Sequence, residues 1–181
     1  MQPGVDLQAT EWVRFTWSLA DLNLDVPTPT PYRCRSAKRG EAAEILSVVL
    51  AAYASDPVWN ELLDGIRTRM AARIRETLGA AGSQYIVAEL NNSIVAVSGV
   101  ARSHWTDQNL LTGLCVAPEH QRKGLGTHLL AASLLSLRDM GLATAQVYTE
   151  SGSLADRKLY PLFGSRREGG VEYPGLRPPP S

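Results

Sequence analysis

The sequence predicts one domain of the α/β (α+β) class, in which helices and strands alternate and pack in layers. Its 181 residues, 44% of them hydrophobic, are enough for one well-packed core, whereas two ordinary domains would each be small. Stretches with strand-like alternation are separated by stretches in which apolar residues recur at helical spacing. No internal repeat stands out along the chain, so a layered domain remains the expectation.

The first thirty residues (1–30) read as an N-terminal arm that carries an extra strand. Val13, Phe15, Trp17 and Leu19 alternate with polar residues, as in a half-buried strand. Val26 to Pro31 contains three prolines and predicts a connector, because proline interrupts both helices and central strands. The strand could pair with its own sheet or with another subunit, so a homodimer is a hypothesis.

Residues 31–174 predict the body of the domain, and residues 175–181 a proline-rich tail. Asn91-Asn92 is a tight-turn pair between two apolar stretches and predicts a β-hairpin. Asp56-Pro57 offers a helix cap followed by proline, and predicts one helix reaching about Leu78. The expected strands are 32–35, 85–90, 94–101, 110–116, 145–149 and 167–173, and the expected helices are 40–53, 57–78, 125–140 and 154–163.

Charge and composition exclude several classes of function. Lys plus Arg and Asp plus Glu number 18 each, so no basic field attracts nucleic acid or an anionic membrane. No stretch approaches the roughly 20 apolar residues that cross a bilayer, and we expect a cytoplasmic protein. Cys34 and Cys115 are far apart and read as reduced core thiols. His120 and His128 have no ligand cluster around them, so we predict no metal.

The segment Val116 to Thr127 is the most informative motif in the chain. An apolar run gives way to a basic turn with two glycines and then resumes as a helix. The first N–H groups of a helix lack intrahelical partners and lie at the positive end of its dipole, which suits a phosphate anion. A P-loop would need Lys-Ser/Thr directly after the last glycine, but Gly126 precedes Thr127-His128. A dinucleotide fingerprint would need a third glycine where Leu129 stands.

The same segment resembles the acetyl-CoA-binding motif of the GNAT superfamily of N-acetyltransferases, Gln/Arg-x-x-Gly-x-Gly/Ala, here Gln121 to Gly126. A second stretch, Ser151 to Gly164, is similar to the closing motif of that family and keeps Leu159-Tyr160. It departs from the family pattern at Ser153, Asp156 and Ser165. The order of elements from Tyr32 to Tyr173 also suits the family.

The resemblance implies the GNAT fold, a mixed central sheet of about six to seven strands that is flanked by helices and splayed beside the cofactor strand. It implies acetyl-CoA as the acyl donor, held mainly by backbone N–H groups of the glycine turn. A main-chain N–H near Leu114 or Cys115 would stabilise charge on the thioester oxygen. The implied cofactor contacts are Leu114, Cys115, Val116, Gln121, Arg122, Lys123, Gly124, Leu125, Gly126, Thr127 and Ser153. Tyr160 is the implied catalytic residue, next to the cofactor sulfur.

The resemblance further implies direct transfer in a ternary complex, with the helices of residues 40–78 on the acceptor side. The acceptor is expected to be a small-molecule or peptide amine, which must lose a proton before it attacks. The candidate bases near strand ends are Glu89, His104, Asp107 and Glu150, and the candidate acceptor-side residues are Tyr53, Asp56, Trp59, Asn60 and Arg67. The alternative is a non-catalytic, GNAT-like domain that binds an acyl-CoA or serves regulation.

Overall fold

The strands form two antiparallel sheets in a computed structural model that describes residues 10–60, 62–178 and 180–181. The first sheet has the order β2-β3-β4-β5, with bounds Arg33–Ser36, Ser83–Leu90, Ser93–Ala101 and Leu110–Val116. The second has the order β6-β1-β7, with bounds Thr144–Glu150, Trp12–Ser18 and Arg166–Val171. The prediction of six to seven strands flanked by helices is confirmed, but they are not joined in one mixed sheet. β5 and β6 lack a ladder between them because they diverge.

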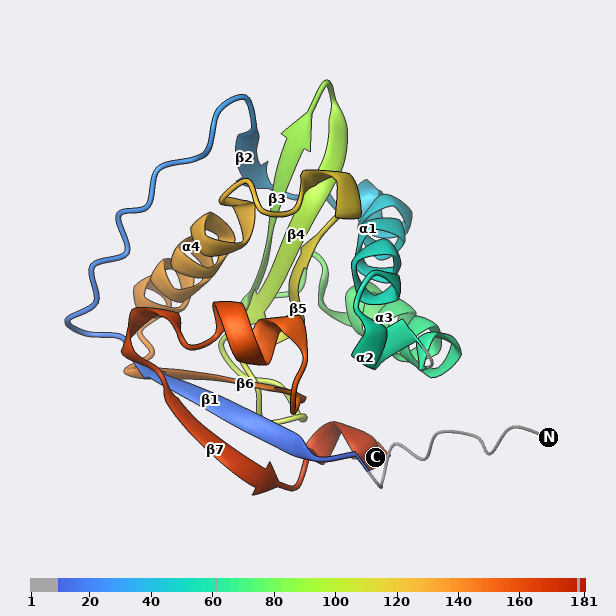
Figure 1. The fold of residues 1–181 in the computed structure, drawn as a ribbon, viewed down its shortest axis with the longest axis vertical. Coiled ribbons are helices and arrows are strands. Elements are labelled where there is room, and N and C mark those ends of the chain that lie inside the picture. The colour runs from blue at the N-terminus through green and yellow to red at the C-terminus, as the bar shows by residue number, and fades with distance from the viewer. Residues whose placement is uncertain (1–9, 61, 179) are drawn as a thin grey trace.

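The helices cover the two faces of the first sheet (Figure 1). Helices α1 (Ala42–Ala54), α2 (Pro57–Asn60) and α3 (Leu63–Thr77) lie on one face, and α4 (Leu125–Asp139) lies on the other. The core divides in the same way. Ile45 and Ile74 pack with β3 and β4 in one cluster, while Leu130 and Leu134 pack with β1 and β6 in another. Among the described helices, none combines the length and hydrophobicity needed to span a membrane.

The strand of the N-terminal arm is the central strand of the second sheet. Trp12 to Ser18 pair with β6 on one side, and Trp12 to Thr16 pair with β7 on the other. The alternation noted in the sequence buries Val13, Phe15 and Trp17 against α4. The strand therefore pairs within its own chain, and both of its edges are occupied. This removes the free edge from which the homodimer hypothesis was drawn.

The expected single helix from Pro57 to Leu78 is instead two helices, α2 and α3. Asp56 Oδ1 accepts the backbone N–H of Val58 at 3.0 Å, so the predicted cap is present. The Leu62 N–H donates to Trp59 O at 2.9 Å, a three-residue spacing that tightens the chain between the helices. Trp59 and Leu62 are both buried, and their inward packing accounts for the break.

The β-hairpin agrees with the sequence, whereas the last expected helix takes a different form. Asn91 and Asn92 have φ values of 51° and 64°, as the tight turn between β3 and β4 requires. The expected helix of residues 154–163 is a π-helical turn at Ala155–Leu159, followed by a 3-10 turn at Leu162–Gly164. A further 3-10 turn, Pro174–Leu176, includes the first two residues of the expected tail (175–181).

Candidate functional site

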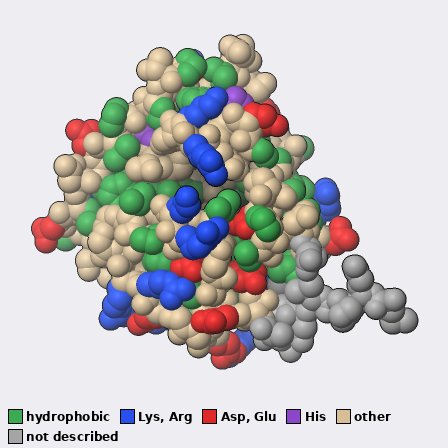
Figure 2. Space-filling view, in the orientation of Figure 1, with side chains coloured by type: hydrophobic (Ala, Val, Ile, Leu, Met, Phe, Trp, Pro, Cys, Tyr) green, Lys and Arg blue, Asp and Glu red, His purple; other side chains and the backbone are tan. Residues whose placement is uncertain are grey.

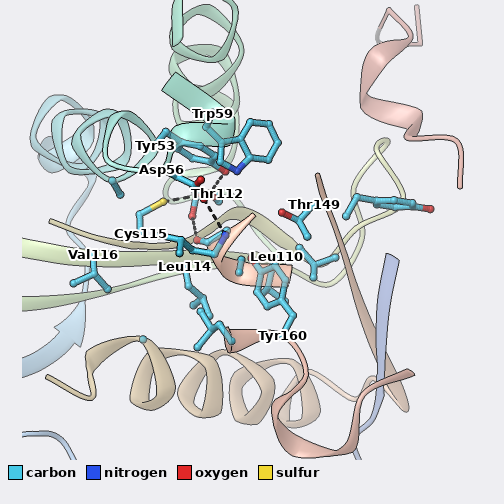
Figure 3. Close-up of a pocket in the computed structure, with 18 of the residues that line it drawn as sticks. Tyr53, Asp56, Trp59, Leu110, Thr112, Leu114, Cys115, Val116, Thr149 and Tyr160 are labelled. Carbon is cyan, nitrogen blue, oxygen red and sulfur yellow. Dashed lines mark hydrogen bonds between the residues drawn. The ribbon is translucent and has the colours of Figure 1, made fainter. Parts of the chain in front are cut away.

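The two sheets meet at one point and then separate, which opens a cavity between β5 and β6. The Asn109 N–H donates to Gln146 O at 2.8 Å, and the Gln146 N–H donates to Asn109 Oδ1 at 3.0 Å. Beyond this junction β5 pairs with β4 and β6 pairs with β1. The cavity has a volume of about 360 Å³. It runs from the loop before α4, past the middle of β5, to helices α1, α2 and α3 (Figure 3).

The glycine loop forms one end of this cavity. Gly124 has a φ of 87° and directly precedes α4, and Arg122 has a φ of 61°. The left-handed conformation at Gly124 costs a residue without a side chain little, and it turns the chain into the helix start. The Gln121 side chain donates to Val116 O at 3.0 Å and to Ser55 Oγ at 3.1 Å, which ties the loop to β5 and α1. The backbone N–H groups at the start of α4 thus lie beside the cavity.

Eight of the eleven residues expected to contact the cofactor line the cavity, namely Leu114, Cys115, Val116, Gln121, Arg122, Gly124, Gly126 and Thr127. The other three lie elsewhere. Lys123 is exposed, and Leu125 is buried among the residues under α4. Ser153 is fully buried, bonds Thr149 Oγ1 at 2.9 Å and accepts the Asp156 N–H at 3.3 Å. These contacts of Ser153 stabilise the turn before Tyr160.

A bulge in β5 brings two tyrosine hydroxyls to the middle of the cavity. Gly113 has a φ of 70°, and the Gly99 N–H donates to the Thr112 hydroxyl at 3.0 Å where the β4–β5 register shifts. A Cβ at Gly113 would lie 3.2 Å from the Tyr160 hydroxyl and 3.3 Å from that of Tyr53. Both hydroxyls therefore approach the backbone of β5 at this one position, and only glycine leaves space for them.

The Tyr160 ring is held from behind, so that its hydroxyl faces β5. The ring packs against Phe15 and Trp17, with centroid distances of 5.6 Å and 5.9 Å. Burial raises the pKa of the Tyr160 hydroxyl, and a hydrogen bond from the Leu114 backbone N–H offsets only part of that shift. At neutral pH the hydroxyl is therefore protonated and can donate a hydrogen bond.

Cys115 lies on the same strand, but its thiol is inert. Burial raises the pKa of Cys115 to about 12, and its Sγ donates to Thr112 O at 3.4 Å. The thiolate is the nucleophilic form of cysteine, so a neutral buried thiol is a poor nucleophile.

The four candidate bases are in very different surroundings. Glu89 bonds Arg35 at 3.0 Å. None of the four, Glu150 included, is among the residues that line the cavity. Burial lowers the pKa of His104 to about 4. Glu150 lies on the face of β6 that carries Tyr148, which lines the cavity. Its Oε2 is buried without a hydrogen-bond partner among the described residues.

The electrostatics of Glu150 suit a proton acceptor. Burial raises its pKa first, and the neighbouring negative charge of Asp56 raises it further. Asp56 itself lines the cavity and accepts the Leu154 N–H at 3.0 Å.

The far wall of the cavity contains residues that sequence reasoning missed. Of the five expected acceptor-side residues, Tyr53, Asp56 and Trp59 line the cavity and Asn60 and Arg67 do not. The residues not anticipated there include Arg73, Gln108 and Tyr173. One signal was available in the sequence. Arg73 occupies a helical position between apolar residues that face the core, where a charged side chain is unusual.

Basic side chains lie along the outer surface of the site. In Figure 2 Lys and Arg side chains form a row from the loop before α4 to the turn at Ala155–Leu159. Arg122, Lys123, Arg157 and Lys158 are exposed in these two segments.

The expectation that the protein holds no metal stays a prediction. The described residues contain no group of three or more His, Cys, Asp or Glu side chains that could hold an ion.

Comparison with known proteins connects this geometry to a family. Residues 81–164 match the model of the acetyltransferase (GNAT) domain. A mycothiol acetyltransferase from Sanguibacter keddieii is 30% identical over 172 residues, which cover 86% of this chain and 53% of that relative. The chain therefore spans about half the length of this relative.

Solved structures support the same fold. A Drosophila protein superposes with a TM-score of 0.60 at 16% identity, covering 88% of this chain and 48% of the other. A GNAT-family protein from Novosphingobium aromaticivorans gives a TM-score of 0.53 at 14% identity, covering 88% and 60% respectively. At these identities the likeness establishes the fold.

Proposed function

Because this chain belongs to the GNAT acetyltransferase family through its residues 81–164, we propose that it acetylates a primary amine, using acetyl-CoA, by direct attack in a ternary complex. The observation that carries the proposal is the meeting of Leu114, Tyr160 and Tyr53 at the β5 bulge. This point lies midway along the cavity, between an anion-binding loop and a compartment lined by side chains.

The glycine loop fits the diphosphate of acetyl-CoA. The start of α4 offers unpaired backbone N–H groups, and Gly124 and Gly126 leave the backbone accessible from the cavity. A Cβ at Gly126 would lie 3.5 Å from the Leu159 side chain. A side chain there would occupy space between β5 and the Leu159 turn that the arm of the cofactor would use. Arg122 and Lys158, which also line the cavity, add positive charge. When bound, acetyl-CoA supplies an acyl group activated as a thioester.

Leu114 and Tyr160 would stabilise charge at the reacting centre. The Leu114 N–H, which bonds the Tyr160 hydroxyl in the free protein, would exchange that bond for one to the thioester oxygen when the cofactor is bound. The Tyr160 hydroxyl would donate a hydrogen bond to the departing sulfur. Its raised pKa makes complete proton transfer to a thiolate unfavourable, since a thiol has a pKa of about 8.5, so hydrogen bonding is the role assigned to it.

Glu150 is the residue that we propose removes the proton from the amine. Tyr148, two residues earlier on β6, lines the cavity, and the Glu150 Oε2 is buried without a hydrogen-bond partner among the described residues. The pKa raised by burial and by Asp56 makes it a stronger base than an exposed carboxylate. The Asp56 carboxylate, which lines the cavity, would attract the ammonium form of the acceptor.

Calorimetry with acetyl-CoA, followed by a thiol-release assay over a panel of amines, tests the proposal. We expect binding with one site per chain and thiol release that depends on the amine. Binding without any amine-dependent release would favour the alternative, an acyl-CoA-binding or regulatory domain. Absence of binding would overturn the cofactor assignment as well. Location in the cytoplasm stays a prediction.

A further inference from the structure

Arg73 is a buried cation for which the described chain provides no counterion. It is 7% exposed, and no described carboxylate lies within 4.0 Å of its guanidinium. It donates to Leu111 O at 2.6 Å and to the Tyr173 hydroxyl at 3.1 Å. These bonds use two of the five N–H groups of a guanidinium. Because burying an unpaired charge is costly, an anionic group from outside the chain would be favoured here.

The hydroxyl of Tyr173 provides an independent observation at the same point. It accepts hydrogen bonds from Arg73 and from Gln108 Nε2, each at 3.1 Å. A hydroxyl has two acceptor positions and one hydrogen, so both acceptor positions are filled. Among the described residues nothing accepts the Tyr173 hydrogen. Arg73, Gln108 and Tyr173 all line the cavity, and the pair Arg73 and Tyr173 therefore presents only donors to it.

The position of this pair along β5 shows which end of the cavity it serves. Arg73 bonds Leu111, at the start of the strand, whereas the glycine loop follows the end of the strand at Val116. The bulge with Tyr160 and Leu114 lies between them. Leu111 and Leu114 are separated by roughly 10 Å, at about 3.3 Å of rise per residue. The donors thus face the acceptor compartment and lie far from the diphosphate loop.

We propose that Arg73 and Tyr173 form a carboxylate subsite, and that the acceptor is an amine with a carboxylate group several bonds from its nitrogen. This proposal rests on the amine-acetylating function above. Glu150 and Asp56 would face the amino end of the acceptor, and the planar guanidinium of Arg73 would bind its carboxylate through two parallel N–H donors. Arg69, one helical turn earlier and exposed at the cavity mouth, adds positive charge on the approach.

The experiment compares pairs of acceptors that differ only at the far end. 4-Aminobutanoate and 6-aminohexanoate are assayed beside their carboxamides. Glycine and glycinamide form a further pair, which is too short to reach from the reacting centre to Arg73. We expect kcat/KM at least tenfold higher for the two longer acids than for their amides. Arg73→Gln should reduce that ratio to below threefold while acetyl-CoA affinity is unchanged. Arg75→Gln is the control, because Arg75 is an exposed arginine on the same helix. This variant should leave the acid-to-amide ratio unchanged.

Tyr173→Phe is the milder variant if Arg73→Gln does not fold. It keeps the ring that packs on Trp12 at 4.5 Å and on Tyr148 at 5.3 Å, and removes only the hydroxyl. We expect the acid-to-amide ratio to fall several-fold. Equal rates for acids and amides in the wild type, or an unchanged ratio in these variants, would overturn the subsite.

Equilibrium binding separates failure of the subsite from failure of the proposed function. If no amine is acetylated, 4-aminobutanoate and its amide are titrated against the protein while tryptophan fluorescence is recorded, since Trp12 packs against Tyr173. Binding of the acid alone, lost in Arg73→Gln and kept in Arg75→Gln, would support the subsite without the transferase. No difference between acid and amide would reject it.

Discussion

The two ends of the cavity are built from different materials. The loop end consists largely of backbone, since Gly124, Gly126 and the start of α4 present main-chain groups from one continuous segment. The acceptor end consists of side chains such as Arg73, Tyr173 and Asp56, which come from three separate parts of the chain. A backbone-built site tolerates side-chain changes but depends on local conformation. A side-chain-built site depends on individual functional groups, so the two ends should respond to mutation in different ways.

The largest expected effect is at the acceptor end, from Glu150→Gln. Loss of the proton acceptor should lower kcat by about 10² to 10⁴, the usual range for one acid–base group, while acetyl-CoA affinity is unchanged. In the wild type, kcat/KM should fall as pH drops through the raised pKa of Glu150. That acid limb should be absent in the variant. A pH–rate profile that keeps the limb in Glu150→Gln would contradict the assignment.

The same variant has a stability signature with a definite sign. A carboxyl whose pKa is raised on folding binds its proton more tightly in the native state, so its contribution to stability falls as pH rises between the unfolded and the folded pKa. Glu150→Gln should therefore unfold at higher urea concentration than the wild type at pH 7. The gain should shrink as pH falls and disappear below about pH 3, where the carboxyl is protonated in both the folded and the unfolded state.

Tyr160→Phe tests the reacting centre, where the two ends of the cavity meet. The ring contacts with Phe15 and Trp17 remain, so we expect normal folding and normal acetyl-CoA affinity. Loss of the hydrogen bond to the leaving sulfur should lower kcat by about 100-fold, within the range for such groups. Tyr85→Phe is the matched control. Its hydroxyl bonds Thr77 Oγ1 at 2.6 Å, and the residue does not line the cavity. Equal turnover in Tyr160→Phe and wild type would remove Tyr160 from the mechanism.

Gly124→Ala tests whether the loop end depends on backbone conformation. The residue has a φ of 87°, and a Cβ there would lie 3.3 Å from Pro29. Backbone strain of about 1 to 3 kcal/mol should distort the loop and weaken acetyl-CoA binding by about tenfold. Gly141→Ala is the control, because Gly141 has a φ of 93°, no neighbour within 4 Å of its Cβ, and no place in the cavity lining. Similar affinity losses in both variants, measured by calorimetry, would mean that strain acts through global stability.

The smallest effect is expected at Asp156, a residue outside both ends. Its carboxylate accepts the Gly152 N–H at 2.8 Å and Arg167 Nε at 2.7 Å, and Arg167 holds its pKa below the usual range. This stability is present above the unfolded pKa and is lost as pH falls through the folded pKa. Asp156→Asn should cost about 1 kcal/mol at pH 7 in urea unfolding, and flatten the acid dependence. Glu172→Gln, in an exposed ion pair with Arg177, should change neither.

The sequence by itself determined the elements and the loop end. Alternation marked β1, the Asn91-Asn92 pair marked the hairpin, and the glycine motif located residues that line the cavity, because each of these features depends on a short continuous segment. The break between α2 and α3 was not foreseen, since it depends on the inward packing of Trp59.

Tertiary structure alone decided the acceptor end. It placed β1 between β6 and β7, separated β5 from β6 beyond one junction, and brought Arg73 on α3 to Tyr173 near the end of the chain. It also gave Glu150 and Glu89, two glutamates near strand ends, different surroundings. Arg35 bonds Glu89, whereas burial and the charge of Asp56 raise the pKa of Glu150. Local patterns report backbone conformation, whereas pairing across a sheet and the environment of a charge depend on residues distant in sequence.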